Sequence, residues 1–125
     1  MIRQILVIDD EASILVVVKT TLELTAGWKV ITADSAMAGF EIAKRERPDA
    51  ILLDVVMPEP DGVAILHKLQ ADPQTQSIPV IFLTAKARYD EQQSFKHLEI
   101  AGIIVKPFEP KTIADQVRAL LGWER

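Results

Sequence analysis

The chain has 125 residues, of which 49% are hydrophobic and 26% charged, with a formal net charge of −4 at pH 7. This length fits one domain with its own core, and the composition excludes an intrinsically disordered chain. Cysteine is absent, which excludes a disulfide scaffold and a thiolate metal site. The lysines and arginines are scattered and form no basic stripe, which argues against direct binding of nucleic acid.

The apolar runs of the chain are far shorter than a bilayer-spanning helix requires. The first residues, Met1 to Gln4, lead directly into a predicted strand, so the sequence shows no signal peptide. We therefore expect no membrane insertion. The lack of cysteine agrees with a reducing compartment, and we expect a cytoplasmic location.

Taken in chain order, short apolar runs alternate with segments of helical periodicity, five times each. Gly27 and Pro48 are placed to end the first two helices. The fourth helix is the least regular, because it is polar and has only Tyr89, Phe95 and Leu98 as apolar anchors. The expected elements are, in order, a strand at residues 5–8, a helix at 13–25, a strand at 28–33, a helix at 36–47, a strand at 50–54, a helix at 63–71, a strand at 79–83, a helix at 88–98, a strand at 102–105 and a helix from Pro110 with the buried stripe Ile113, Val117, Leu120 and Leu121.

Strict alternation of strand and helix requires right-handed crossovers and a parallel sheet with both faces covered. The strongly apolar bodies of four of the five strands agree with such double coverage. We predict the α/β class: a three-layer α/β/α sandwich with a five-stranded parallel sheet in flavodoxin-like order 2-1-3-4-5 and five helices. Residues 1–125 are expected to form a single domain with no effector domain.

Polar side chains follow four of the five predicted strands. Asp9 and Asp10 follow the first strand and Asp54 ends the third, while Thr84 and Lys106 follow the fourth and the fifth. In the order 2-1-3-4-5 these strand ends meet at the carboxyl edge, where open α/β sheets bind ligands. Each residue alone has an ordinary explanation as a helix cap, a turn former or a solvated surface group. Unrelated surface residues have no reason to share one edge, so the joint pattern favours a functional site.

Three crowded carboxylates repel one another, and either a raised pKa on one of them or a bound cation relieves that repulsion. A cluster of oxygen ligands without histidine or cysteine suits a hard divalent ion, Mg²⁺ above all. The Lys106 ammonium and the Thr84 hydroxyl match the needs of phosphoryl oxygens. Asp54, at the centre of the set, is then the candidate nucleophile toward phosphorus, forming an acyl phosphate.

These motifs resemble the receiver domain of bacterial two-component response regulators, of which the chemotaxis response regulator is the simplest relative. The resemblance covers essentially the whole chain, in four ordered motifs. The segments that carry it are Ile5–Glu11 (ILVIDDE), Leu52–Asp54 with Met57–Pro58 and Asp61–Gly62, Ile78–Ala85 (IPVIFLTA) and Val105–Phe108 (VKPF).

The resemblance implies that Asp54 is the phospho-acceptor. It also implies that Mg²⁺ is the cofactor, bound directly by Asp10, Asp54 and the backbone carbonyl of Val56. In the same family pattern Asp9 acts on the ion largely through water. Val56 and Lys86 occupy the two positions thought to tune the lifetime of the phosphoryl group.

The resemblance further implies that Thr84 and Lys106 contact the phosphoryl group and that the Lys106–Pro107 peptide bond is cis. Ala85 is small and leaves the acceptor open to a phosphodonor. The sequence departs from the pattern at Ile103, where many members carry Tyr or Phe that swings inward together with the threonine. An aliphatic side chain offers neither the ring nor the hydroxyl of that switch.

The function we expect is a phospho-accepting signalling switch, not an enzyme beyond its own phosphotransfer and autodephosphorylation. A sensor histidine kinase or a histidine phosphotransfer protein is the expected donor, and a downstream protein target would bind the fourth helix, fifth strand and fifth helix. The alternative is a degenerate receiver that acts as a constitutive interaction module, supported by Ile103 alone. The sequence lacks the Ser/Thr/Gly-rich phosphate loop of a flavodoxin and the glycine fingerprint of a dinucleotide-binding protein. It also has Val56 where an aspartyl phosphatase would carry a second acid, two residues after the nucleophile.

Overall fold

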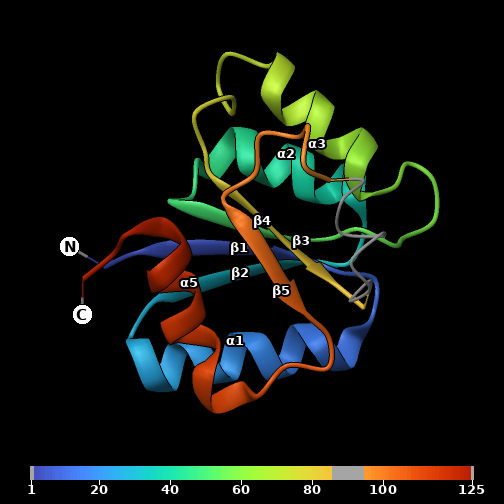
Figure 1. Ribbon diagram of the computed structural model, residues 1–125. Helices are drawn as coiled ribbons and strands as arrows, with labels where there is room; N and C mark the ends of the chain where they lie inside the picture. Colours follow the sequence, from blue (N-terminus) through green and yellow to red (C-terminus); the bar gives the residue numbers. More distant parts are fainter. Residues whose placement is uncertain (1, 86–94, 125) are drawn as a thin grey trace.

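A five-stranded parallel sheet with helices on both faces forms the centre of the molecule (Figure 1). The computed structural model describes residues 2–85 and 95–124. The strand order is β2-β1-β3-β4-β5, which confirms the predicted class and topology. The strands are β1 (Gln4–Ile8), β2 (Lys29–Ala33), β3 (Ala50–Asp54), β4 (Val80–Thr84) and β5 (Gly102–Val105).

The helices cover the sheet in two pairs, with α2 and α3 on one face and α1 and α5 on the other (Figure 1). Their bounds are α1 (Ala12–Ala26), α2 (Ala36–Glu46), α3 (Gly62–Ala71) and α5 (Ile113–Leu121), with a 3₁₀ turn η1 (Pro110–Thr112) directly before α5. None of the helices within residues 2–85 and 95–124 is long and apolar enough to span a bilayer.

Each face of the sheet has its own apolar core because neighbouring strand residues point to opposite faces. Leu6 and Leu53 pack with α2 and α3, whereas Val7 and Leu52 pack with α1 and α5. All four side chains are fully buried, and each such burial contributes about 1.5–3 kcal/mol. The central strands therefore need continuous apolar runs, which explains why the sequence made them easy to recognise.

The ends of the helices follow the capping residues in the sequence. Ser35 begins α2 by accepting a hydrogen bond from the backbone N–H of Ala38 at 3.2 Å, and Asp61 begins α3 in the same way. Gly27 ends α1 with a φ of 69°, a left-handed conformation that glycine adopts without strain. These turns fix where each crossover returns the chain to the sheet.

Two expectations about the helices differ from what the described residues show. Five helices were expected, and the described residues form four α-helices; most of the expected helix at 88–98 lies outside the described residues, and residues 95–98 form a turn. Leu120, expected in the buried stripe of the last helix, is 37% exposed. Its methyl groups lie against Gly102 of β5, in the space that glycine leaves by having no side chain.

Candidate functional site

The carboxyl ends of β1, β3, β4 and β5 lie side by side because these strands are consecutive neighbours in the sheet. Ile8 pairs with Leu53 across β1 and β3, so Asp9 and Asp54 emerge next to each other. Thr84 ends β4, and its carbonyl oxygen accepts the backbone N–H of Lys106 at 2.7 Å. The sheet thus brings the five predicted side chains to one edge.

Asp54 is buried, with 3% of its surface exposed. Burial raises the pKa of Asp54 to about 6, and the nearby Asp9 carboxylate adds to that effect. The Lys106 ammonium and the backbone N–H of Val56, which donates to Asp54 Oδ1 at 3.1 Å, act in the opposite direction. The Asp54 carboxyl therefore ionises less readily than a surface aspartate unless a further positive charge lies near it.

Lys106 is the cation at the centre of this edge. Its Nζ lies 2.7 Å from Asp9 Oδ2, 3.3 Å from Glu11 Oε1 and 3.6 Å from Asp54 Oδ2. Burial alone would lower the pKa of Lys106, but the hydrogen bond and the charge of Asp9 outweigh burial and raise it. Lys106 is therefore protonated and positively charged, and it lies among three carboxylates.

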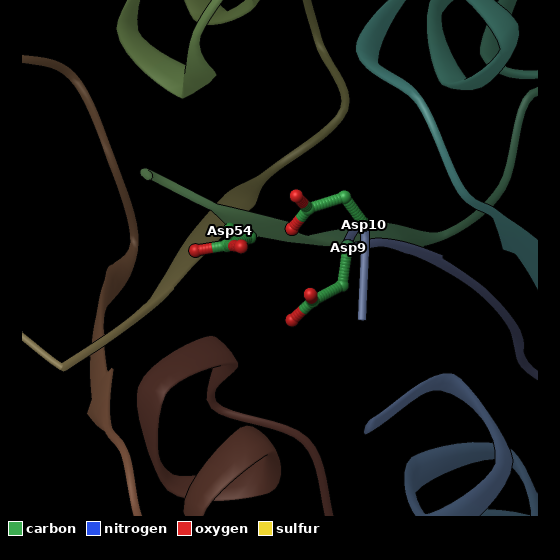
Figure 2. Close-up of side chains that lie close together, drawn as sticks. All are labelled: Asp9, Asp10 and Asp54. Carbon is green, nitrogen blue, oxygen red and sulfur yellow. The ribbon is translucent and has the colours of Figure 1, made fainter. Parts of the chain in front are cut away.

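Asp9, Asp10 and Asp54 form a cluster that can hold a metal ion, since one oxygen from each lies within 4.8 Å of the others. In Figure 2 the carboxylates of Asp9 and Asp10 point from the end of β1 toward the side on which Asp54 lies. Asp9 is fully buried and Asp10 is exposed. A site of oxygen donors that is open to water on one side fits a hard divalent cation such as Mg²⁺.

The remaining predicted positions surround this cluster. Thr84 is fully buried, whereas Ala85 and Val56 are exposed. The Lys106–Pro107 peptide bond is cis, as the family resemblance implied, and so is the bond between Glu59 and Pro60. Lys86 lies outside the described residues.

Glu11 and Gly62 belong to the motifs of the resemblance but had no role assigned from the sequence, and the structure places both at the site. Glu11 accepts a hydrogen bond from Lys106 Nζ, and its side chain makes no capping bond to α1. Its own backbone N–H donates to Asp9 Oδ1 at 2.9 Å, which fixes the orientation of the buried carboxylate. Gly62 packs against the end of β3, with its N–H donating to the Val55 carbonyl at 3.1 Å. A glycine after an aspartate indicated a turn, and only the fold shows the close approach.

Ile103 lies on β5, opposite Phe82 of β4. It is partly buried and packs against the core beneath α2 and α3. The position that carries an aromatic ring in many receiver domains therefore holds an aliphatic side chain that contributes to this core.

Comparison with known proteins gives a consistent result. Residues 5–118 match the family described as response regulator receiver domain. The chain is 36% identical over 119 residues to a probable transcriptional regulator, ycf27, of Porphyridium aerugineum, covering 95% of this chain and 48% of that protein. It is 33% identical over 121 residues to the phosphate regulon transcriptional regulatory protein PhoB of Pseudomonas aeruginosa, covering 95% and 52%. The chain spans about half the length of the curated relatives it matches.

Solved structures agree with the fold. The chemotaxis response regulator CheY4 of Vibrio cholerae superposes with a TM-score of 0.88 at 29% identity, covering 96% of this chain and 99% of that one. The N-terminal domain of a response regulator receiver protein from Methanoculleus marisnigri gives a TM-score of 0.77 at 33% identity, covering 99% and 100%. Similarity therefore extends over the whole sheet and its carboxyl edge.

Proposed function

Because the chain belongs to the response regulator receiver domain family, we propose that Asp54 accepts a phosphoryl group and that the domain is a phosphorylation-dependent signalling switch. The observation that carries this proposal is the placement of a buried Asp54 beside both a carboxylate cluster and the Lys106 ammonium, 3.6 Å away. A structural carboxylate has no need of such surroundings, whereas a nucleophile toward phosphorus does.

In the proposed reaction an oxygen of Asp54 forms a bond to phosphorus as the bond from phosphorus to the donor breaks. The donor is a phosphohistidine of a sensor histidine kinase or of a phosphotransfer protein, and its imidazole is the leaving group. Asp9, Asp10, Asp54 and the Val56 carbonyl would hold Mg²⁺, which when bound supplies positive charge to the phosphoryl oxygens. We expect Asp9 to act on the ion largely through water.

Lys106 and Thr84 complete the environment of the phosphoryl group in this proposal. The Lys106 ammonium would leave its contacts with the carboxylates and pair with a phosphoryl oxygen, while the Thr84 hydroxyl donates to another. Thr84 sits at the end of β4, and its carbonyl already accepts the backbone N–H of Lys106. Movement of either residue would therefore displace the other residue and β5.

The added phosphoryl charge would change a partner-binding surface. We place that surface on β5 and α5, together with the expected fourth helix, most of which lies outside the described residues. A downstream protein is the proposed target, and the cytoplasm is the proposed location. The organisation as a single domain without an effector domain stays a prediction. The only catalysis we propose is phosphotransfer to Asp54 and slow hydrolysis of the resulting acyl phosphate, which releases inorganic phosphate.

The alternative is a degenerate receiver that binds its partner constitutively. The observation in its favour is Ile103, whose aliphatic side chain packs into the core instead of supplying a ring. Against it stands the retention of Asp9, Asp10, Asp54, Thr84 and Lys106 at one edge.

The test is the intact mass of the protein after incubation with acetyl phosphate, with Mg²⁺ and with a chelator, beside an Asp54→Asn variant. We expect a single phosphoryl adduct that requires both the metal and Asp54. An adduct on the Asp54→Asn variant would move the acceptor elsewhere, and no adduct under any condition would support the constitutive module.

A further inference from the structure

At the end of the sheet opposite the acidic cluster, two tryptophans and two arginines come together from three parts of the chain. Arg3 precedes β1, Trp28 precedes β2, and Arg118 and Trp123 belong to the end of α5 and the residues after it. In Figure 1 both chain termini lie at this end of the molecule. The chain has only two tryptophans, and both are here.

The four side chains form a continuous stack. The Trp28 and Trp123 rings meet edge to face, with centroids 5.4 Å apart. The Arg3 guanidinium lies 4.1 Å from the centre of the Trp123 ring, and the Arg118 guanidinium lies 5.1 Å from that of Trp28. Each indole is thus flanked by one cation, an arrangement stabilised by the quadrupole of the ring.

A cavity of about 410 Å³ opens beside this stack, and Arg3, Trp28, Arg118 and Trp123 are among the residues that line it. This volume lies in the range of small-molecule sites. Ile2 and Ala26 add apolar surface to the lining, and Glu124 is its one carboxylate among the described residues. Arg3 is the one cation of this lining that forms no ion pair among the described residues.

The polar groups of the cavity are mostly hydrogen-bond donors. Among residues 2–85 and 95–124, no acceptor is bonded to either indole N–H, and Arg3 forms no ion pair with an acidic side chain. Arg118 pairs with Asp115 at 2.9 Å on its own helix. Arg3 is exposed, so its N–H groups face water and remain available to a ligand in the open cavity. Donors of this kind are what an anion requires.

We propose that this Trp28–Trp123 pocket, formed by Arg3, Trp28, Arg118 and Trp123, binds a small organic anion bearing a phosphate or a carboxylate. The guanidinium of Arg3, which lies 4.1 Å from the centre of the Trp123 ring, would donate a fork of hydrogen bonds to the anion. The apolar and aromatic lining covers the body of the ligand, since inorganic phosphate alone would fill only part of the volume. This site is independent of phosphorylation at Asp54.

The two indole N–H resonances provide the test, because both report on the pocket and no other tryptophan contributes. The probes are two organic anions, adenosine 5′-monophosphate and benzoate. Inorganic phosphate tests an anion without an organic group, and adenosine tests the organic group without a charge. We expect saturable shifts of both resonances with at least one organic anion at millimolar concentrations or below. Binding of inorganic phosphate should be at least tenfold weaker, and adenosine should not saturate.

Variants separate anion binding from packing. Arg3→Gln should raise the dissociation constant at least tenfold, whereas Arg3→Lys, which keeps the charge, should raise it less. Arg45→Gln is the matched control, because Arg45 is an exposed arginine of α2 paired with Glu46 and should bind as the wild type does. The proposal is overturned if neither organic anion gives a saturable shift, if adenosine binds as well as its monophosphate, or if Arg3→Gln binds like the wild type.

Discussion

Lys106 Nζ lies 2.7 Å from Asp9 Oδ2, although 97 positions separate the two residues in the sequence. Asp9 is fully buried, and the lysine side chain is 12% exposed. The same ammonium also lies within 4.0 Å of Glu11 and Asp54. Without a metal, this one cation offsets much of the negative charge at the carboxyl edge, so both the stability and the metal affinity of the domain should depend on it.

Replacing Lys106 by methionine keeps most of the apolar stem and removes the charge. In the presence of a chelator we expect Lys106→Met to lower the free energy of unfolding by about 2 kcal/mol, because buried carboxylates lose their counter-ion. In saturating Mg²⁺ the loss should shrink, since the metal supplies the missing charge. Urea unfolding in each condition measures both values.

Lys111→Met is the control for this experiment, because Lys111 is an exposed lysine of η1. It should change the free energy of unfolding by less than about 0.5 kcal/mol, with or without metal. An equal effect of Mg²⁺ on Lys106→Met and on the wild type would contradict a shared role of lysine and metal in neutralising the cluster.

Asp54 makes the metal-free protein sensitive to pH. Burial, followed by the nearby Asp9 carboxylate, raises the pKa of Asp54 from its ordinary value of 3.8 to about 6. A carboxyl whose pKa is higher in the folded state favours folding when it is protonated. Its contribution is therefore complete below pH 3.8 and is lost as the pH rises through 6.

Asp54→Asn removes this titration. In chelator at pH 7.5 the variant should be more stable than the wild type by about 2 kcal/mol, and the two should converge below pH 4, where Asp54 is protonated. Unfolding in urea at half-unit steps of pH gives the difference curve, in which carboxylates remote from Asp54 cancel. A difference that stays flat from pH 4 to 7.5 would show that the pKa of Asp54 is not raised.

The buried and the exposed partner of Lys106 should contribute differently to the free energy of unfolding. Glu11 is 58% exposed and lies 3.3 Å from the ammonium, so Glu11→Gln should cost less than about 0.5 kcal/mol. Asp9 is buried and accepts hydrogen bonds both from Lys106 and from the Glu11 backbone, so Asp9→Asn should cost about 2 kcal/mol. Thermal or urea unfolding of the pair in chelator measures the contrast; equal costs would mean that burial does not decide the strength of these pairs.

The sheet was predictable because a strand covered on both faces needs an unbroken apolar run, as in residues 5–8 and 50–53. The strand order then followed from the requirement that the polar strand ends share an edge. Helix ends were less certain: the last helix begins with the 3₁₀ turn η1, and Leu120 satisfies the helical period yet is exposed at the margin of α5. Periodicity identifies the side that faces the sheet but not how far the sheet extends beneath it.

The candidate site was predictable as a set of residue types at strand ends. Which aspartate pairs with the lysine and which is exposed was not predictable, because adjacent aspartates look alike in a sequence. Only the fold shows that Asp9 is buried against Lys106 while Asp10 faces water. The Trp28–Trp123 contact joins residues 95 positions apart, and no local pattern announces such a pair. Long-range contacts of this kind depend on the packing of whole elements.

Gly62 tests how closely the position of Asp54 depends on the turn that follows β3. A methyl group at this position would overlap the backbone carbonyl oxygen of Asp54 and come within 2.7 Å of Val55 Cα. Because both obstacles are backbone atoms, α3 or the end of β3 must shift. We expect Gly62→Ala to lower the free energy of unfolding by about 2 kcal/mol or more. It should also slow formation of the phosphoryl adduct from acetyl phosphate at least tenfold.

Gly27→Ala is the matched control, since Gly27 also borders a helix but has no atom near the added methyl group. Its φ of 69° makes alanine cost about 1 kcal/mol, and the turn lies at the opposite end of the sheet from Asp54. This variant should therefore lose some stability and keep the wild-type rate of adduct formation. If both variants slowed the reaction equally, the effect would follow from general destabilisation and not from displacement of Asp54.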